Sequence, residues 1–365
     1  MGQYKKFWYL LVAVLIGAFS ILGYYGFEVY REAPPIPQQY VSESGEKVIT
    51  HDEILHGQTA WQTTGGMQVG SVWGHGAYQA PDWTADWLHR ELTNWLDITA
   101  NQEFGKNFAD LNDEQQTLLK ARLTKEYRGS KVENGTVVLS NTRLAAMEKT
   151  AQYYISLYGD DPATKVTREH FAMKDNTLPD LQARKDLAKF FFWTAWTASA
   201  ERPNTHASYT NNWPHEPLIN NVPTPENVIW SIASVVFLIA GIGFVVWIWS
   251  FKKREDEQDP PIPEVDPLTK LQLTPSQRAL GKYLFTVLAL FLLQVNLGAI
   301  VAHYTVEGQE FYGIDISQYL PYSLVRTWHI QAALFWIAMA FLAGGLFLAP
   351  IINGGKDPKF QKLGV

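Results

Sequence analysis

Four long apolar segments interrupt an otherwise polar chain. They cover residues 7–29, 228–251, 279–302 and 324–351, and each approaches the roughly 20 residues that a helix needs to cross a bilayer. A polar stretch of domain size separates the first segment from the second. The pattern therefore predicts an α-helical membrane protein with four transmembrane helices and one large extramembrane domain.

The same pattern predicts where each part of the chain begins and ends. The first segment follows Lys5 and Lys6, as a signal peptide would, but it is longer than the usual apolar core of one. We therefore predict an uncleaved anchor. The predicted parts are a transmembrane helix at 1–29, an outer domain at 30–225, transmembrane helices at 226–251, 279–304 and 324–351, a cytoplasmic loop at 252–278, an outer connection at 305–323 and a cytoplasmic segment at 352–365.

Shorter periodicities predict a mixed architecture for the outer domain. Apolar spacing typical of amphipathic helices recurs at 112–127, 142–157 and 180–196. Residues 132–140 favour a short hairpin. The segment 61–95 is dense in Gly and Trp, which indicates a packed aromatic core around tight turns.

Two Thr-Pro pairs mark expected helix starts. Thr224 precedes Pro225 just before the second apolar segment, and Thr274 stands in the same position before the third. Gln277 is placed to complete a capping box with Thr274. The acidic, proline-rich stretch 255–267 between them predicts an exposed loop.

Basic residues predict the direction in which the chain crosses the membrane. With four crossings, three basic groups fall on one side, namely Lys5 and Lys6; Lys252, Lys253 and Arg254; and Lys356, Lys359 and Lys362. The positive-inside rule makes this side cytoplasmic. We therefore expect a multi-pass protein of a bacterial inner membrane, with its large domain in the periplasm.

The amino-acid composition restricts which cofactors and partners the chain can bind. The 365 residues include no cysteine and carry a formal net charge of −6. The lack of cysteine excludes disulfides, thiolate metal sites, iron–sulfur clusters and the Cys-x-x-Cys-His attachment of c-type haem. The net charge does not indicate a nucleic-acid-binding protein. Any redox cofactor must be held by histidine or by non-covalent contacts.

Nine histidines are the candidates for redox chemistry. We expect the seven in the polar domain to be surface or structural residues, namely His51, His56, His75, His89, His170, His206 and His215. His303 and His329 differ, because they lie at or inside membrane segments, where ionisable groups are rare and usually functional. On the predicted topology both lie near the outer edge of the membrane on antiparallel helices.

His329 is a candidate haem ligand. A neutral imidazole among apolar helices can bind haem iron, and b-type haem needs no covalent attachment. Arg326 and Trp328 precede it, and an arginine at the membrane edge suits a haem propionate. An interhelical hydrogen bond is the structural alternative for this imidazole.

His303 and Glu307 are candidates for quinol oxidation. They are four residues apart, so they share one helical face if the helix continues that far. An imidazole beside a carboxylate can accept a proton from a hydroquinone while electrons leave separately. Two alternatives stay open at this point, because His303 and His329 together can ligate one haem, and Glu307 can simply be solvated.

Several motifs together resemble the quinol-dependent nitric oxide reductases of the haem–copper oxidase superfamily. They are WQTTGG at 61–66, GHGAYQAPDWTADWLHRE at 74–91, YTNNWPHEP at 209–217, AHYTVEG at 302–308 and RTWHIQ at 326–331. The resemblance extends over the whole chain. As a set these motifs are much more specific than any one of them.

The resemblance implies roles for the membrane residues. His329 would be an axial ligand of the low-spin haem b, whose second histidine belongs to a later helix, with Arg326 and Trp328 near the haem. His303 and Glu307 would be the quinol-binding pair. The outer domain would be a cytochrome-c-like domain that has lost its haem, because quinol replaces cytochrome c as the electron donor.

Members of this family are longer than this chain. Their high-spin haem b3, non-haem iron and catalytic residues belong to later helices, so we expect this chain to be the N-terminal half of such an enzyme, with no catalytic residue of its own. The expected partners are quinol, nitric oxide, the lipid bilayer, the C-terminal remainder and, as a homodimer, a second copy. The family also implies a calcium site.

Two other functions remain as rival hypotheses. One is a different quinol-linked b-type cytochrome, in which His303 and His329 are the two ligands of one haem. The other is a non-catalytic, membrane-anchored binding protein in which both histidines are structural. The first rival predicts that either substitution abolishes the haem, and the second predicts no haem at all.

Overall fold

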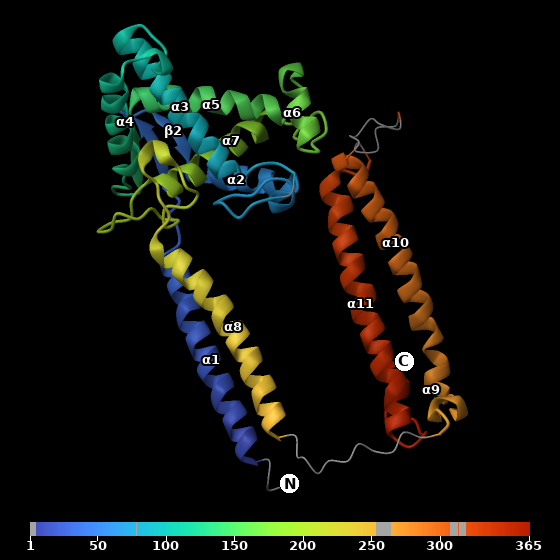
Figure 1. Cartoon of the computed structure of the whole chain (residues 1–365). Helices are drawn as coiled ribbons and strands as arrows, with labels where there is room; N and C mark the ends of the chain where they lie inside the picture. Colours follow the sequence, from blue (N-terminus) through green and yellow to red (C-terminus); the bar gives the residue numbers. More distant parts are fainter. Residues whose placement is uncertain (1–4, 78, 253–263, 307–312, 314–318) are drawn as a thin grey trace.

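The computed structural model describes residues 5–77, 79–252, 264–306, 313 and 319–365. It is mostly helical, with a mixed outer domain at one end of four long helices (Figure 1). This arrangement confirms the predicted fold class of a helical membrane protein with one large extramembrane domain.

Within the described residues, four helices are long and apolar enough to cross a membrane. They are α1 (Lys5–Arg31), α8 (Pro225–Lys252), α10 (Gly281–Val306) and α11 (Tyr322–Ile352). The mean hydropathy of their apolar windows lies between 2.1 and 2.5, and no residue in the windows of α1 and α8 is buried within the chain. Such exposed apolar surfaces are suited to lipid or to further helices.

The α10 and α11 helices pack against each other along a single stripe (Figure 1). On α11 the stripe recurs at alternating intervals of three and four residues, namely Tyr322, Val325, His329, Ala332 and Trp336. This spacing keeps one face of a helix against its neighbour. The Trp336 ring meets Phe291 of α10 edge to face, with ring centroids 5.5 Å apart. His329 therefore lies in the contact between the two helices.

Two short helices close the end of this pair remote from the outer domain, α9 (Pro275–Ala279) and α12 (Gln361–Gly364). Thr274 and Gln277 form the predicted capping box at α9. The Ser276 hydroxyl donates to Asp357 at 2.5 Å, and this bond lowers the pKa of Asp357. The start of α10 is thereby tied to the segment after α11. The loop predicted at 255–267 lies mostly outside the described residues.

The outer domain is built around six helices. They are α2 (His51–Thr63), α3 (Trp83–Phe104), α4 (Asp113–Arg128), α5 (Asn141–Leu157), α6 (Lys165–His170) and α7 (Leu181–Ser199). The helices α4, α5 and α7 confirm the three that apolar spacing predicted. Short 3₁₀ turns join these elements at η1 (Gly66–Gln68), η2 (Phe108–Asp110), η3 (Pro162–Thr164) and η4 (Pro217–Ile219), and η5 (Pro267–Lys270) precedes α9.

Aromatic rings fill the core of the outer domain. Trp87 stacks on Tyr154 at a centroid distance of 5.0 Å, and Trp83 stacks on Phe191 at 5.6 Å. Both tryptophans are almost fully buried. Stacked and edge-to-face ring pairs stabilise beyond their burial alone. The aromatic core predicted from the Trp-rich segment is therefore confirmed.

A three-stranded sheet lies beside the helices, in the order β2-β1-β3. Its strands are β1 (Gln39–Ser42), β2 (Lys47–Thr50) and β3 (Thr136–Leu139). The first two are antiparallel, whereas β3 runs parallel to β1.

The hairpin predicted at 132–140 was wrong except for its turn. Asn134 and Gly135 both have positive φ angles, of 49° and 76°, as a tight two-residue turn requires. Backbone bonds of 2.8 and 2.9 Å join Glu133 and Thr136 across it. The chain then leaves to pair with β1, because that pairing buries Val137 and Leu139.

One ion pair is enclosed by the core. The Arg143 guanidinium donates to Glu91 at 3.2 Å, and the carboxylate also accepts from Tyr127 at 2.9 Å and from Trp87 at 2.7 Å. Burial raises the pKa of Glu91, while Arg143 and these donors oppose the rise. A buried carboxylate with a charged partner and full hydrogen bonding is tolerated, whereas a lone one is not.

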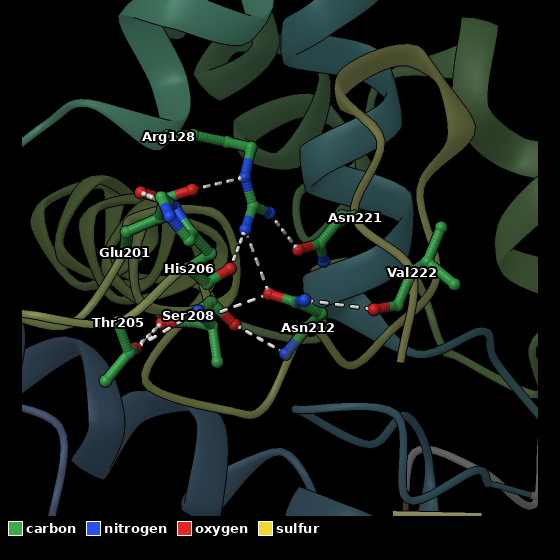
Figure 2. A network of polar contacts seen from close by, with 9 residues as sticks. Arg128, Glu201, Thr205, His206, Ser208, Asn212, Asn221 and Val222 are labelled. Carbon is green, nitrogen blue, oxygen red and sulfur yellow. Dashed lines mark hydrogen bonds and ion pairs between the residues drawn. The ribbon is translucent and has the colours of Figure 1, made fainter. Parts of the chain in front are cut away.

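Arg128, at the end of α4, holds the segment that leads from α7 to the membrane helix α8. Its guanidinium donates to Glu201 at 3.0 Å, to Asn221 at 2.9 Å and to the backbone carbonyl of His206 (Figure 2). Asn212 continues the network through Ser208 and Val222. One partly buried side chain thus orders a long connection that has little regular structure.

Candidate functional site

The imidazole of His329 is anchored to α10 by one ring nitrogen. Its Nδ1 lies 2.9 Å from the backbone carbonyl oxygen of Gln294. A carbonyl oxygen can only accept, so Nδ1 carries the proton and Nε2 of the neutral ring keeps its lone pair. The Gln294 side chain is itself fixed, because its Oε1 accepts from Trp336 at 3.1 Å.

Gly298 creates the space for this contact. A Cβ atom at position 298 would lie 2.8 Å from Cε1 and 3.1 Å from Nδ1 of His329. Any larger residue would therefore push the imidazole away from α10. The glycine lets the ring lie close to α10 one turn beyond Gln294, within reach of the Gln294 carbonyl.

This arrangement has the features of a metal-binding histidine. Such residues commonly donate their second ring N–H to a backbone carbonyl, which fixes the tautomer and makes the other nitrogen a better ligand. The interhelical hydrogen bond expected as the alternative for His329 is thus present, and it leaves Nε2 available as a ligand. Its role as a haem ligand stays a prediction.

His303 lies further toward the outer end of α10. The residue is 7% exposed. The neighbouring Tyr304 donates its hydroxyl to the carbonyl of Leu320, which closes the outer end of the helix pair. His329 contacts α10 at Gln294 and Gly298, so five residues, or about 7.5 Å of helix, separate Gly298 from His303 along the chain.

The other predicted residues occupy three different settings. Arg326 donates to the carbonyl of Gln68 in the outer domain at 3.1 Å. Trp328 is 45% exposed and lies off the stripe that faces α10. Glu307, the predicted partner of His303, lies outside the described residues.

Two histidines of the outer domain contact the same connecting segment. His89 lies 3.0 Å from Glu216, and His215 lies 3.0 Å from the carbonyl of Asn221. Within the described ranges, no group of three or more His, Asp or Glu residues could hold a metal ion.

Two family models match the chain. Residues 37–215 match the cytochrome c-like domain of NorB, a nitric oxide reductase protein, and residues 278–365 match cytochrome c and quinol oxidase polypeptide I. The chain belongs to the NorB family of nitric oxide reductases. A search of the curated proteins gave no match.

Family membership gives the chain an oxidoreductase role within the haem–copper oxidase superfamily and implies haem and metal cofactors. The two matches correspond to the two parts of the chain described above, the outer domain and the α10–α11 pair. The first match covers most of the outer domain, and the second covers α10, α11 and the His329 contact.

Sequence reasoning missed the residues that seat His329. Gln294 and Gly298 lie in an apolar segment in which the prediction singled out His303 alone. A polar Gln within a membrane span followed four residues later by Gly was the available signal, because polar residues there commonly bond across helices and glycine permits close approach.

Proposed function

We propose that the chain is the quinol-oxidising, electron-input half of a quinol-dependent nitric oxide reductase. The complete enzyme would convert two NO and one quinol into N2O, water and quinone, since quinol gives up as many electrons and protons as the reduction consumes, namely two of each. High-spin haem b3 and non-haem iron would belong to the remainder of the enzyme.

The geometry of His329 carries this proposal. A neutral imidazole, held through Nδ1 in a helix contact of a membrane segment, has the donor chemistry that haem iron takes. Arg326, three residues before His329 in α11, would add a positive charge near a propionate. Haem b, when bound, supplies a one-electron redox centre.

The choice of quinol over cytochrome c rests on the outer domain. The domain matches a cytochrome c-like family, yet the chain has no cysteine with which to attach c-type haem. Its interior is filled by the stacked rings of Trp83, Trp87 and their neighbours. An electron donor soluble in the membrane, reaching α10 and α11 directly, avoids the need for a haem in this domain.

His303 and Glu307 would receive the protons of quinol. A buried imidazole at the outer end of α10 can accept a proton from a quinol hydroxyl, and a carboxylate four residues later in the sequence would pass it to water. Because the site lies at the end of α10 nearest the outer domain, the protons would leave on that side.

The orientation follows from charge. Lys5 begins α1, and Lys356, Lys359 and Lys362 follow α11, so these basic residues lie at the helix ends remote from the outer domain. By the positive-inside rule that end would be cytoplasmic. The large domain would then be in the periplasm of a bacterium, and the helices in its inner membrane.

Reduced-minus-oxidised spectra of the complete enzyme test the proposal. His329→Ala should remove the low-spin b-type signal, because no other ligand replaces Nε2. His303→Ala should keep that signal, and His170→Ala, a change at an exposed outer-domain histidine, serves as the matched control. Loss of the same haem in both membrane variants would instead favour a cytochrome in which His303 and His329 are joint ligands. An unchanged spectrum in His329→Ala would refute the ligand assignment.

A further inference from the structure

The loop between α2 and α3 reaches across to the outer end of α11. Gly65 and Gly66 begin this loop with positive φ angles of 110° and 51°. A Cβ atom at Gly65 would lie 2.6 Å from Cβ of Ser323, so only glycine allows the loop backbone to lie this close to the first turn of α11. We call residues 65–77 and Gln79 the docking loop.

Gln68 of the docking loop holds two consecutive residues of α11. Its side-chain Nε2 donates to the Thr327 hydroxyl at 2.8 Å, and its backbone carbonyl accepts from Arg326 at 3.1 Å. The Thr327 hydroxyl in turn donates to the carbonyl of Ser323 at 2.8 Å. Side chain and main chain of one glutamine thereby fix the helix surface just before His329.

A second contact extends this connection to α10. Gln79 donates to the hydroxyl of Tyr322 at 3.1 Å, and the rings of Tyr322 and Tyr304 meet with centroids 6.4 Å apart. Tyr304 is the neighbour of His303. Tyr322, Tyr304 and Val325 are almost fully buried and belong to the same continuous apolar core as the outer domain.

The first turn of α11 needs such support. Its N-cap position is Pro321, which makes no side-chain capping bond, and an uncapped helix start leaves backbone N–H groups to be satisfied elsewhere. A turn without a cap is free to fray unless tertiary contacts hold it. The docking loop supplies those contacts from the outer domain.

We propose that the docking loop is a strut that sets the position of the outer end of α11, and that Gln68 is a positioning residue for the electron-input site. His329 follows Thr327 by two residues, so a shift of this turn moves the imidazole relative to Gln294 and Gly298. The cytochrome-c-like outer domain would then serve to position α11 rather than to carry a haem. The consequence for quinol and haem rests on the proposed function, whereas the docking contact does not.

A double-mutant cycle in the complete enzyme tests the strut. Gln68→Ala and Thr327→Val each remove one side of the same hydrogen bond, Thr327→Ser keeps the hydroxyl, and Gln62→Ala changes an exposed glutamine of α2. The readouts are the midpoint potential of the haem, the rate of its reduction by quinol, and thermal unfolding of the protein.

We expect Gln68→Ala and Thr327→Val to retain the haem, to slow its reduction by quinol about fivefold, the factor for one neutral hydrogen bond, and to shift its potential in the same direction. The double variant should be no slower than either single variant, because both remove the same bond. Thr327→Ser and Gln62→Ala should behave as wild type.

Wild-type potential and rate in both Gln68→Ala and Thr327→Val, or effects that multiply in the double variant, would overturn the proposal. Thermal unfolding separates its failure from that of the proposed function. If the effects of Gln68→Ala and Thr327→Val on thermal unfolding were non-additive but no haem was bound at His329, the docking contact would be retained and the haem assignment rejected. If the effects of the two substitutions on unfolding were additive while haem was bound, the docking contact would be rejected and the haem assignment retained.

Discussion

The outer domain and the α10–α11 pair bury polar groups in opposite ways. In the outer domain, Glu91 and Arg143 lie inside a closed aromatic core with all their neighbours supplied by the same domain. In the helix pair, the polar contacts of His329 lie on one stripe, while most of the remaining surface is apolar and exposed. The buried pair of the domain therefore stabilises the fold of that domain, whereas the stripe determines how α10 and α11 contact each other.

The largest effect should come from breaking the buried pair of the outer domain. Glu91→Gln removes the negative charge but keeps the volume, and it should lower the free energy of unfolding by about 3–5 kcal/mol, because Arg143 is left charged and unpaired. Urea unfolding of the full chain in detergent, followed by near-UV circular dichroism, measures this change.

Two variants control that experiment. Glu103→Gln removes the exposed partner of Arg122 and should change stability by less than about 1 kcal/mol. Adding Arg143→Met to Glu91→Gln should recover part of the lost stability. If Glu91→Gln cost no more than Glu103→Gln, the domain would not depend on this pair.

A smaller and more local effect is expected at Gly298. Alanine at this position would displace the flexible end of His329 and break its bond to Gln294, at a cost of about 0.5–1.5 kcal/mol. Loss of a partner to the second ring nitrogen of a metal ligand typically lowers metal affinity about 10–100-fold. Haem titration of the purified complete enzyme should show weaker binding in Gly298→Ala.

Gly243→Ala in α8 is the matched control, because the described chain leaves open space around that glycine. It should bind haem as the wild type does. Equal behaviour of Gly298→Ala and Gly243→Ala would show that the close contact of the imidazole with α10 has no bearing on ligation.

The smallest effect should come from a partly exposed pair, Glu53 with Lys189. Burial opposes ionisation of Glu53, but hydrogen bonds from Lys189 and Thr50 outweigh it and lower its pKa. A lowered folded-state pKa means that the stabilisation is complete above the unfolded value of about 4.3 and disappears as the pH falls through the folded value.

Unfolding of the wild type and Glu53→Gln between about pH 3 and pH 6 measures this contribution. The wild type should be more stable by less than about 1 kcal/mol at the upper end, and the difference should vanish toward the lower end. A difference that grew with acid would contradict the sign of the shift.

Local pattern predicted much of the fold. The four membrane helices, α4, α5, α7 and the capping box at Thr274 follow from apolar spacing and cap residues that lie close together in the sequence. The partner of β3 could not be predicted in this way, because β1 precedes it by 97 residues and parallel pairing leaves no local signal.

Some residues of the candidate site could likewise be predicted from the sequence, and others could not. His303 and His329 stand out as ionisable residues in apolar segments, so the sequence alone singles them out. Gln294, Gly298 and Gln68 acquire their importance from which face of α10 meets α11 and from a loop far away in the sequence. A nearly uniform apolar helix does not indicate which face that will be.

The most direct test of the electron-input role is the rate at which quinol reduces the haem in His303→Ala. Stopped-flow spectroscopy of the complete enzyme would compare quinol with a small artificial reductant. We expect the variant to be reduced at least about 100-fold more slowly by quinol, the contribution of a positioned proton acceptor, and at the wild-type rate by the artificial reductant. Wild-type reduction by quinol would contradict the account, because quinol would then be oxidised without His303.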